Sequence, residues 1–71
     1  MTNRELLRKR IRESGMKMKY LASECHITAQ AFSSKMVGKS EFNASEMAVL
    51  REKLELSDGD FLTIFFDTEV A

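Results

Sequence analysis

Several features are scarce in this sequence of 71 residues, and each scarcity narrows what the chain can form. It contains no proline, the residue whose ring breaks or kinks a helix. It has a single cysteine, Cys25, so no disulfide can form within the chain. Apolar runs are far shorter than the roughly 20 residues that cross a bilayer, and the basic, amphipathic start of the chain is unlike a signal peptide. We therefore expect a soluble, cytoplasmic protein of one domain, residues 1–71, whose stability depends on helix packing.

Residues that carry chemistry are equally scarce. The single histidine, His26, has no evident catalytic partner, and the sequence shows no nucleophile–base pair or phosphate-binding glycine loop. Cys25 and His26 are adjacent, but a metal site needs about four ligands and there is no further cysteine or histidine. We therefore expect no enzyme activity, cofactor, metal or small-molecule substrate, and we interpret Cys25 as a buried core residue and His26 as a capping residue.

Charge is balanced in total but divided along the chain, with 11 basic and 11 acidic residues. Up to Lys39, nine basic residues outnumber three acidic ones, which leaves +6, whereas beyond Lys39 two basic residues face eight acidic ones, which leaves −6. This division favours an anionic partner for the first part. The basic run at residues 8–12 is either a nucleic-acid patch or a solubilising face, and the sequence does not distinguish the two.

Capping signals and apolar spacings predict the first three helices. Thr2 and Glu5 have the spacing of a capping box, and Gly15 is placed to end the first helix in the left-handed conformation. Thr28 is placed to cap the third helix, while Ile27 packs on Phe32 as a hydrophobic staple. The predicted ranges are about 3–14, 18–25 and 29–36.

The acidic part of the chain predicts two more helices. Asn43 and Glu46 have capping-box spacing, so the fourth helix is expected to begin at Ala44. The segment 58–66 is rich in strand-forming residues, but Ser57 can cap a helix there and no second strand is available to pair with it. We therefore predict a fifth helix and an all-α fold.

Residues 18–38, MKYLASECHITAQAFSSKMVG, have the pattern of two helices joined by a tight turn. Leu21 and Ala22 occupy the apolar and small positions of the first helix, Cys25 and Ile27 flank the turn, and Phe32 fills the central core position of the second helix. This stretch resembles the helix-turn-helix of the phage-repressor family, the lambda repressor and Cro-like proteins. The sequences GKSEFNASE and IFF extend the likeness to small regulators from phages of Gram-positive bacteria over nearly the whole chain.

The resemblance implies a five-helix lambda-repressor-like helix-turn-helix domain with the motif at about residues 18–37. His26 stands at the turn position that the family usually fills with glycine, and histidine tolerates the left-handed conformation better than most residues. The helix at about 29–36 is then the recognition helix, which inserts into the major groove of double-stranded operator DNA.

Small polar side chains near the start of that helix suit a role in reading base edges. Gln30 can pair with adenine through two hydrogen bonds and Ala29 can pack on a thymine methyl group, whereas lysines before and after the helix can contact phosphates. A solvated helix face is the alternative interpretation of the same pattern. The candidate DNA-binding residues are Lys17, Met18, Thr28, Ala29, Gln30, Ser33, Ser34, Lys35, Lys39 and Ser40.

Large apolar residues near the end of the chain exceed what one helix can bury on a single face. They lie among acidic residues, including Asp67 and Glu69, a composition typical of an interaction patch. Burial of the whole set by the first helix is the alternative. The candidate protein-interface residues are Phe61, Leu62, Phe65 and Phe66.

Two functions follow from these patterns. The first is a sequence-specific transcriptional regulator of the phage lysis–lysogeny switch, which occupies an operator as a homodimer because a single domain makes few base contacts. The second is an antirepressor-like module that binds a partner repressor, since an acidic surface can contact the basic DNA-binding face of another protein.

Overall fold

The computed structural model describes residues 2–66 and forms five helices there, with no strand in that range. Every predicted helix is present, and each predicted boundary agrees with the structure within one residue, so the all-α prediction is confirmed. The helices are α1 (Arg4–Ser14), α2 (Met18–Glu24), α3 (Ala29–Met36), α4 (Ala44–Lys53) and α5 (Asp58–Phe66). Within the described range no helix is long and apolar enough to cross a bilayer.

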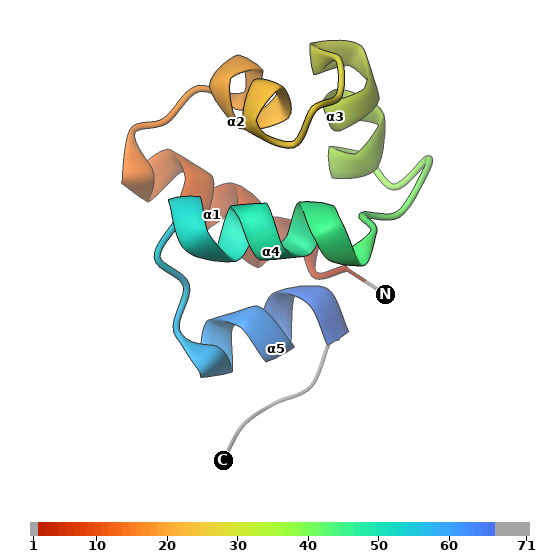
Figure 1. The fold of residues 1–71 in the computed structure, drawn as a ribbon. Coiled ribbons are helices and arrows are strands. Elements are labelled where there is room, and N and C mark those ends of the chain that lie inside the picture. Colours follow the sequence, from red (N-terminus) through yellow and green to blue (C-terminus); the bar gives the residue numbers. More distant parts are fainter. Residues whose placement is uncertain (1, 67–71) are drawn as a thin grey trace.

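The helices α2 and α3 pack together at one end of the molecule, and α5 lies at the opposite end, beyond α4 and against α1 (Figure 1). A single core connects all five helices, and Phe42 links its two ends. The Phe42 ring packs edge-to-face on Phe32 of α3 at 5.6 Å and on Phe65 of α5 at 6.0 Å between ring centroids. The most completely buried large side chains are Leu7, Leu21, Phe32, Met36, Leu50 and Ile64.

The start of α1 differs from its prediction. Asn3, and not Thr2, is the N-cap, because the Asn3 side chain accepts a hydrogen bond from the Leu6 amide at 3.1 Å. The Thr2 hydroxyl instead donates to the Glu41 carboxylate at 3.0 Å. The capping box between Thr2 and Glu5 was wrong, since a charged acceptor from a distant segment binds the Thr2 hydroxyl.

The N-caps of the later helices agree with their predictions. The Asn43 side chain and the Glu46 side chain form a reciprocal capping box at the start of α4. At the start of α5, the Ser57 hydroxyl accepts a hydrogen bond from the Asp60 amide at 3.1 Å. These contacts form between residues three apart, which is why the sequence predicts them well.

Four helices are followed by one residue in the left-handed conformation, and the first of these residues is Gly15 after α1, with a φ of 74°, as predicted. The other three helices also share the hydrogen bond that follows. His26 after α2 has a φ of 60°, Gly38 after α3 a φ of 91°, and Glu55 after α4 a φ of 51°. In each case the next amide bonds back to the preceding helix, for example from Lys39 to the Ser34 carbonyl at 2.9 Å, which is a Schellman motif. The left-handed turn expected at His26 is confirmed, whereas that at Glu55 had no sequence signal.

Candidate nucleic-acid interface

The third helix has one buried face and one exposed face. Phe32 and Met36 point into the core, while Ala29, Gln30 and Ser33 are exposed. These exposed side chains are uncharged and none of them is bulky, so another molecule can approach the helix backbone closely. This half of α3 lies at the end of the molecule away from α5 (Figure 1).

The turn before α3 sets where this surface begins. The Ile27 amide bonds to the Ala22 carbonyl at 3.1 Å, which closes α2, and the partly buried Ile27 side chain packs against the core. Thr28 then caps α3, because its hydroxyl accepts a hydrogen bond from the Ala31 amide at 3.0 Å. The first turn of α3 is therefore fixed by local contacts, while the side chains of Ala29 and Gln30 stay accessible.

Most of the candidate DNA-binding side chains are accessible. Ser34 is half-buried, and Lys35 is mostly covered, as described below. Lys17 is the N-cap residue of α2 and has an extended backbone. The exposed candidates are Lys17, Met18, Thr28, Ala29, Gln30, Ser33, Lys39 and Ser40.

Lys35 differs from its predicted role as a phosphate contact. Its ammonium lies 3.1 Å from the Glu46 carboxylate and donates to the Glu41 carbonyl at 2.9 Å. The two side chains of the ion pair are only 15% and 5% exposed, for Lys35 and Glu46 respectively. Lys35 therefore holds α3 to α4, because its ammonium stabilises the charge of the buried Glu46 carboxylate.

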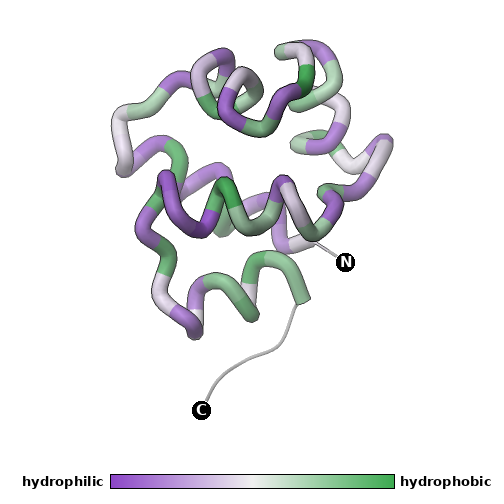
Figure 2. Tube along the Cα trace, viewed as in Figure 1, coloured by the Kyte–Doolittle hydropathy of each residue, from purple (hydrophilic) through white to green (hydrophobic). Residues whose placement is uncertain are grey.

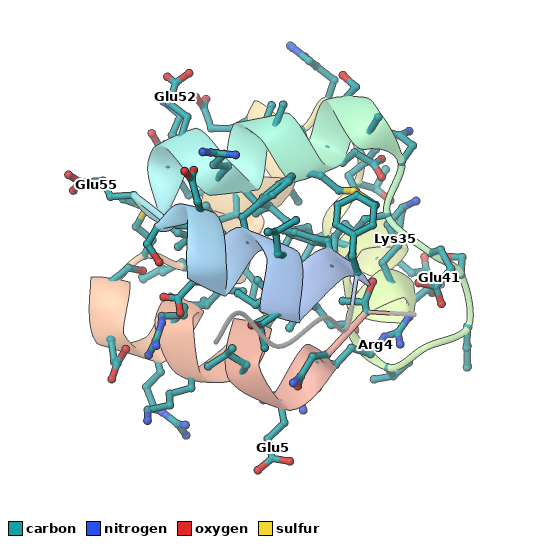
Figure 3. The ribbon with its side chains drawn as sticks, turned by 90° about the horizontal axis from the view of Figure 1, so that it is seen from below. Arg4, Glu5, Lys35, Glu41, Glu52 and Glu55 are labelled. Carbon is teal, nitrogen blue, oxygen red and sulfur yellow. The ribbon has the colours of Figure 1, made fainter. Side chains whose placement is uncertain are left out.

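A cluster around Arg4 was missed by the sequence analysis. The Arg4 guanidinium donates to the Lys35 carbonyl at 2.7 Å, to the Ser40 carbonyl at 3.3 Å and to the Glu41 carboxylate at 2.8 Å. Figure 3 shows Arg4, Lys35 and Glu41 gathered at one side, whereas Glu5 points away from the protein. No local pattern reveals this cluster, since its members come from opposite ends of the first 41 residues.

The same contacts change the acid–base behaviour of Glu41. The hydrogen bond from Arg4, followed by that from Thr2, lowers the pKa of the Glu41 carboxyl below its ordinary value. Arg8 adds a second link between α1 and the end of α3, because its guanidinium donates to the Met36 carbonyl at 3.3 Å. The final carbonyls of α3, which lack partners within the helix, are therefore bound by two arginines of α1.

The basic run of α1 divides into structural and accessible cations. Arg10 binds Asp60 of α5 at 2.7 Å and Glu13 at 2.9 Å, and its hydrogen bond lowers the pKa of the Asp60 carboxyl. Lys9 and Arg12 are exposed and form no ion pair with any residue from 2 to 66. The run is therefore neither wholly a nucleic-acid patch nor wholly a solubilising face, because Arg10 holds α1 to α5.

The apolar residues of α5 also divide into two groups. Phe65 was placed at an interface by the sequence analysis, but it is buried in the core, and Phe61 is half-buried beneath the Arg51 guanidinium at 4.9 Å. Leu62 and Phe66 remain 37% and 54% exposed. Figure 2 shows the apolar character of this helix. The acidic residues expected beside it at positions 67 and 69 lie outside the described residues.

Cys25 is buried as expected, and its burial raises the pKa of the thiol. Across residues 2–66, no three histidine, cysteine, aspartate or glutamate side chains are grouped so that they could hold a metal ion. Comparisons of the chain with models of protein families, with curated proteins and with solved structures give no significant match.

Proposed function

We propose that the protein binds double-stranded DNA through α3 and acts as a transcriptional regulator of the phage Cro and repressor type. The observation that carries this proposal is the division of α3 into two faces. Phe32 and Met36 anchor one face in the core, and Ala29, Gln30 and Ser33 form an accessible surface without bulky side chains. A helix of this kind can enter the major groove, which is wide enough to admit one α-helix.

The helix-turn-helix arrangement supports the same proposal. The helix α2 packs on α3, and His26 adopts the left-handed conformation in the short turn between them. In this arrangement the first helix of the pair crosses the DNA backbone and the second reads the bases. The likeness to lambda-repressor-like domains is therefore part of the proposal.

Base reading is assigned to the first two turns of α3. Gln30 can donate and accept a hydrogen bond with the same adenine, whereas Ala29 can contact a thymine methyl group and Ser33 several base edges. Lys17 and Lys39 are exposed lysines on either side of α3 in sequence and are assigned to phosphates, together with Ser40. Gln30 is therefore the main determinant of sequence preference.

A regulator of this size needs two copies on its operator. One α3 contacts only a few base pairs, and a two-fold symmetric pair of domains doubles the contacts. Leu62 and Phe66, which are exposed on α5, are the proposed contact between the two copies. The bound dimer then regulates transcription by excluding polymerase or a competing repressor from the operator.

The test is the selection of duplexes from a random-sequence pool, followed by binding measurements on the preferred site. The Gln30→Ala variant should lose about 1 to 3 kcal/mol on that site and relax the preference at one base pair. The Lys39→Ala variant should weaken binding to all duplexes alike and reduce the salt slope by about one unit. Equal, sequence-independent losses for both variants would remove Gln30 from base reading.

A second candidate function is an antirepressor-like module. The exposed Phe66 favours it, because an exposed aromatic side chain is typical of a protein-binding surface. A gel shift with operator DNA, with and without a repressor encoded beside this protein, separates the two functions. DNA binding by the protein alone supports the regulator, and an effect that appears only with the repressor supports the module.

A further inference from the structure

The loop between α3 and α4, residues 37–43, is bound by the side chains of Thr2, Arg4 and Lys35. Thr2 and Arg4, at the start of the chain, both bind the Glu41 carboxylate, at 3.0 Å and 2.8 Å. From the other side, Lys35 donates to the Glu41 carbonyl at 2.9 Å. Glu41 is therefore fixed at its side chain and at its backbone.

Arg4 also binds the backbone on both sides of Lys39. Its Nε donates to the Lys35 carbonyl at 2.7 Å and its Nη2 donates to the Ser40 carbonyl at 3.3 Å. The amide of Lys39 closes the Schellman motif of α3 at 2.9 Å. The main chain that carries Lys39 is therefore ordered on both sides of that residue.

The Lys39 side chain itself is not part of this network. It is exposed and forms no ion pair with any residue in the described part of the chain, in contrast to Lys35, which is paired with Glu46. An exposed ammonium on a fixed backbone can bind a phosphate at a smaller entropic cost than one on a mobile loop. Figure 3 shows how closely the Arg4, Lys35 and Glu41 side chains lie at this site.

We propose that Arg4 is a positioning residue for DNA binding, which orders residues 37–41 through Lys35, Ser40 and Glu41 so that Lys39 meets a phosphate of the duplex. Arg4 acts through Lys39, since its own guanidinium is bound to the protein at four acceptors. The inference rests on the proposed DNA-binding function and adds a residue that the sequence analysis did not assign to it.

Two pairs of charge-matched variants separate positioning from simple electrostatics. Arg4→Gln and Arg12→Gln remove the same charge from the same helix, but only Arg4 contacts the loop. Glu41→Ala and Glu52→Ala remove one negative charge each, and Glu52 is exposed on α4 with no ion pair to residues 2–66. If charge alone matters, the two members of each pair behave alike.

The probe is a labelled duplex of random sequence, about 20 base pairs long, which spans two half-sites. We expect Arg4→Gln to bind it roughly five-fold more weakly than Arg12→Gln. Glu41→Ala should also bind more weakly than the wild type, although the protein becomes more positive, whereas Glu52→Ala should bind as well or better. In the free protein, the Lys39 amide should exchange faster in Arg4→Gln and in Glu41→Ala but not in the two controls.

A double-mutant cycle tests whether Arg4 acts through Lys39. Lys39→Ala should weaken binding in the wild type and in Arg12→Gln, and it should have little further effect in Arg4→Gln. Equal effects of Lys39→Ala in both backgrounds, or unchanged exchange of the Lys39 amide, would overturn the inference. If circular dichroism shows that Arg4→Gln does not fold, Glu41→Ala decides the question. Weaker DNA binding by Glu41→Ala than by the wild type supports the inference, and equal or stronger binding overturns it.

Failure of the proposed function gives a different result. If the wild-type protein binds no duplex at low salt, the proposed function is wrong and Arg4 has no role in DNA binding. If the wild type binds and the matched variants bind alike, only the role of Arg4 is wrong.

Discussion

The two ends of α3 are anchored by different means. At the N-terminal end a single hydroxyl, that of Thr28, caps the helix, and the next two side chains are exposed. At the C-terminal end Arg4 and Arg8 bind the last carbonyls, and Lys35 forms a mostly buried ion pair with Glu46. The N-terminal end is left accessible, and the C-terminal end is fixed to two other helices, α1 and α4.

This difference matters for a helix that is proposed to bind a ligand. The Thr28 cap bonds only to the backbone of α3 and brings no other segment over the helix, so the side chains of its first turn stay accessible. Contacts from α1 and α4 at the other end set the direction of the helix relative to the core, because arginine and lysine side chains bridge separate elements. Free side chains on an oriented helix are what groove recognition requires.

The largest loss of stability is expected for Phe32, in the middle of α3, because its side chain packs the whole helix onto the core. Phe32 is completely buried and packs on Phe42, so Phe32→Ala should cost about 3 to 5 kcal/mol, which is comparable to the whole stability of a domain this small. Thermal unfolding followed by circular dichroism measures it. Val37→Ala is the control, because the Val37 side chain is mostly exposed, and a melt of Phe32→Ala close to that of the wild type would contradict the packing.

The C-terminal anchor can be broken separately. Glu46→Ala leaves the mostly buried Lys35 without its carboxylate and removes half of a capping box, which should cost about 2 kcal/mol. Glu52→Ala on the same helix should be nearly neutral, since Glu52 is exposed. Urea unfolding of both proteins provides the comparison, and equal midpoints would show that the Lys35–Glu46 pair does not anchor α3.

The N-terminal end depends on one hydrogen bond. Thr28→Ala should destabilise the protein by about 1 kcal/mol, because the Ala31 amide loses its acceptor. Thr28→Ser keeps the hydroxyl and should recover most of that loss. Chemical denaturation measures both variants, and a serine variant as unstable as the alanine variant would assign the effect to the threonine methyl group instead.

The two left-handed residues that flank α3 should respond to substitution in opposite directions. Gly38→Ala places a side chain at a φ of 91° and should cost about 1 kcal/mol, although the nearest atom, Arg4 Cζ, is at an ordinary contact distance of 3.5 Å. His26→Gly removes that cost at a φ of 60° and should stabilise the protein by about 0.5 kcal/mol. Melting temperatures that move in the same direction would contradict this account.

The smallest effect concerns the Glu41 carboxyl. Arg4 and Thr2 lower its pKa in the folded state. Their hydrogen bonds to the carboxylate therefore stabilise the protein at pH values above the ordinary glutamate pKa, and this stabilisation is lost as the pH falls through the lowered pKa. A carboxyl NMR titration should give a Glu41 midpoint below the ordinary glutamate value. In Arg4→Gln the Glu41 midpoint should rise toward the ordinary glutamate value, and an unchanged midpoint would show that Arg4 is not its main partner.

Prediction from the sequence was accurate where the stabilising contacts are local. The boundaries of α3 depend on Thr28 and on the residues after Met36, and they agree with the structure. The left-handed turn at Glu55 was missed because the usual signal for such a turn is glycine. At the start of α1, Thr2 and Asn3 are both acceptable caps, and the Thr2–Glu5 spacing favoured Thr2, whereas the structure has Asn3.

The candidate site was predicted in part. The exposed residues Ala29, Gln30 and Ser33 follow from the period of α3 once Phe32 is placed in the core. The roles of Arg4 and Lys35 were not predictable in this way, since Arg4 lies 31 positions from the carbonyl that it binds. The sequence describes both side chains only as basic, and basic residues serve as readily in ion pairs as in binding DNA.

The sequence by itself determined the five helices of residues 2–66, because caps, apolar spacing and the glycines after α1 and α3 act between residues a few positions apart. Only the tertiary structure decided which cations remain accessible and which apolar residues of α5 are buried. Lys39 and Lys35 are alike in sequence, but only Lys35 has a carboxylate of α4 within reach. Likewise Phe65 faces the core and Phe66 does not, because the direction from which α5 packs on α1 selects one side of that helix for burial.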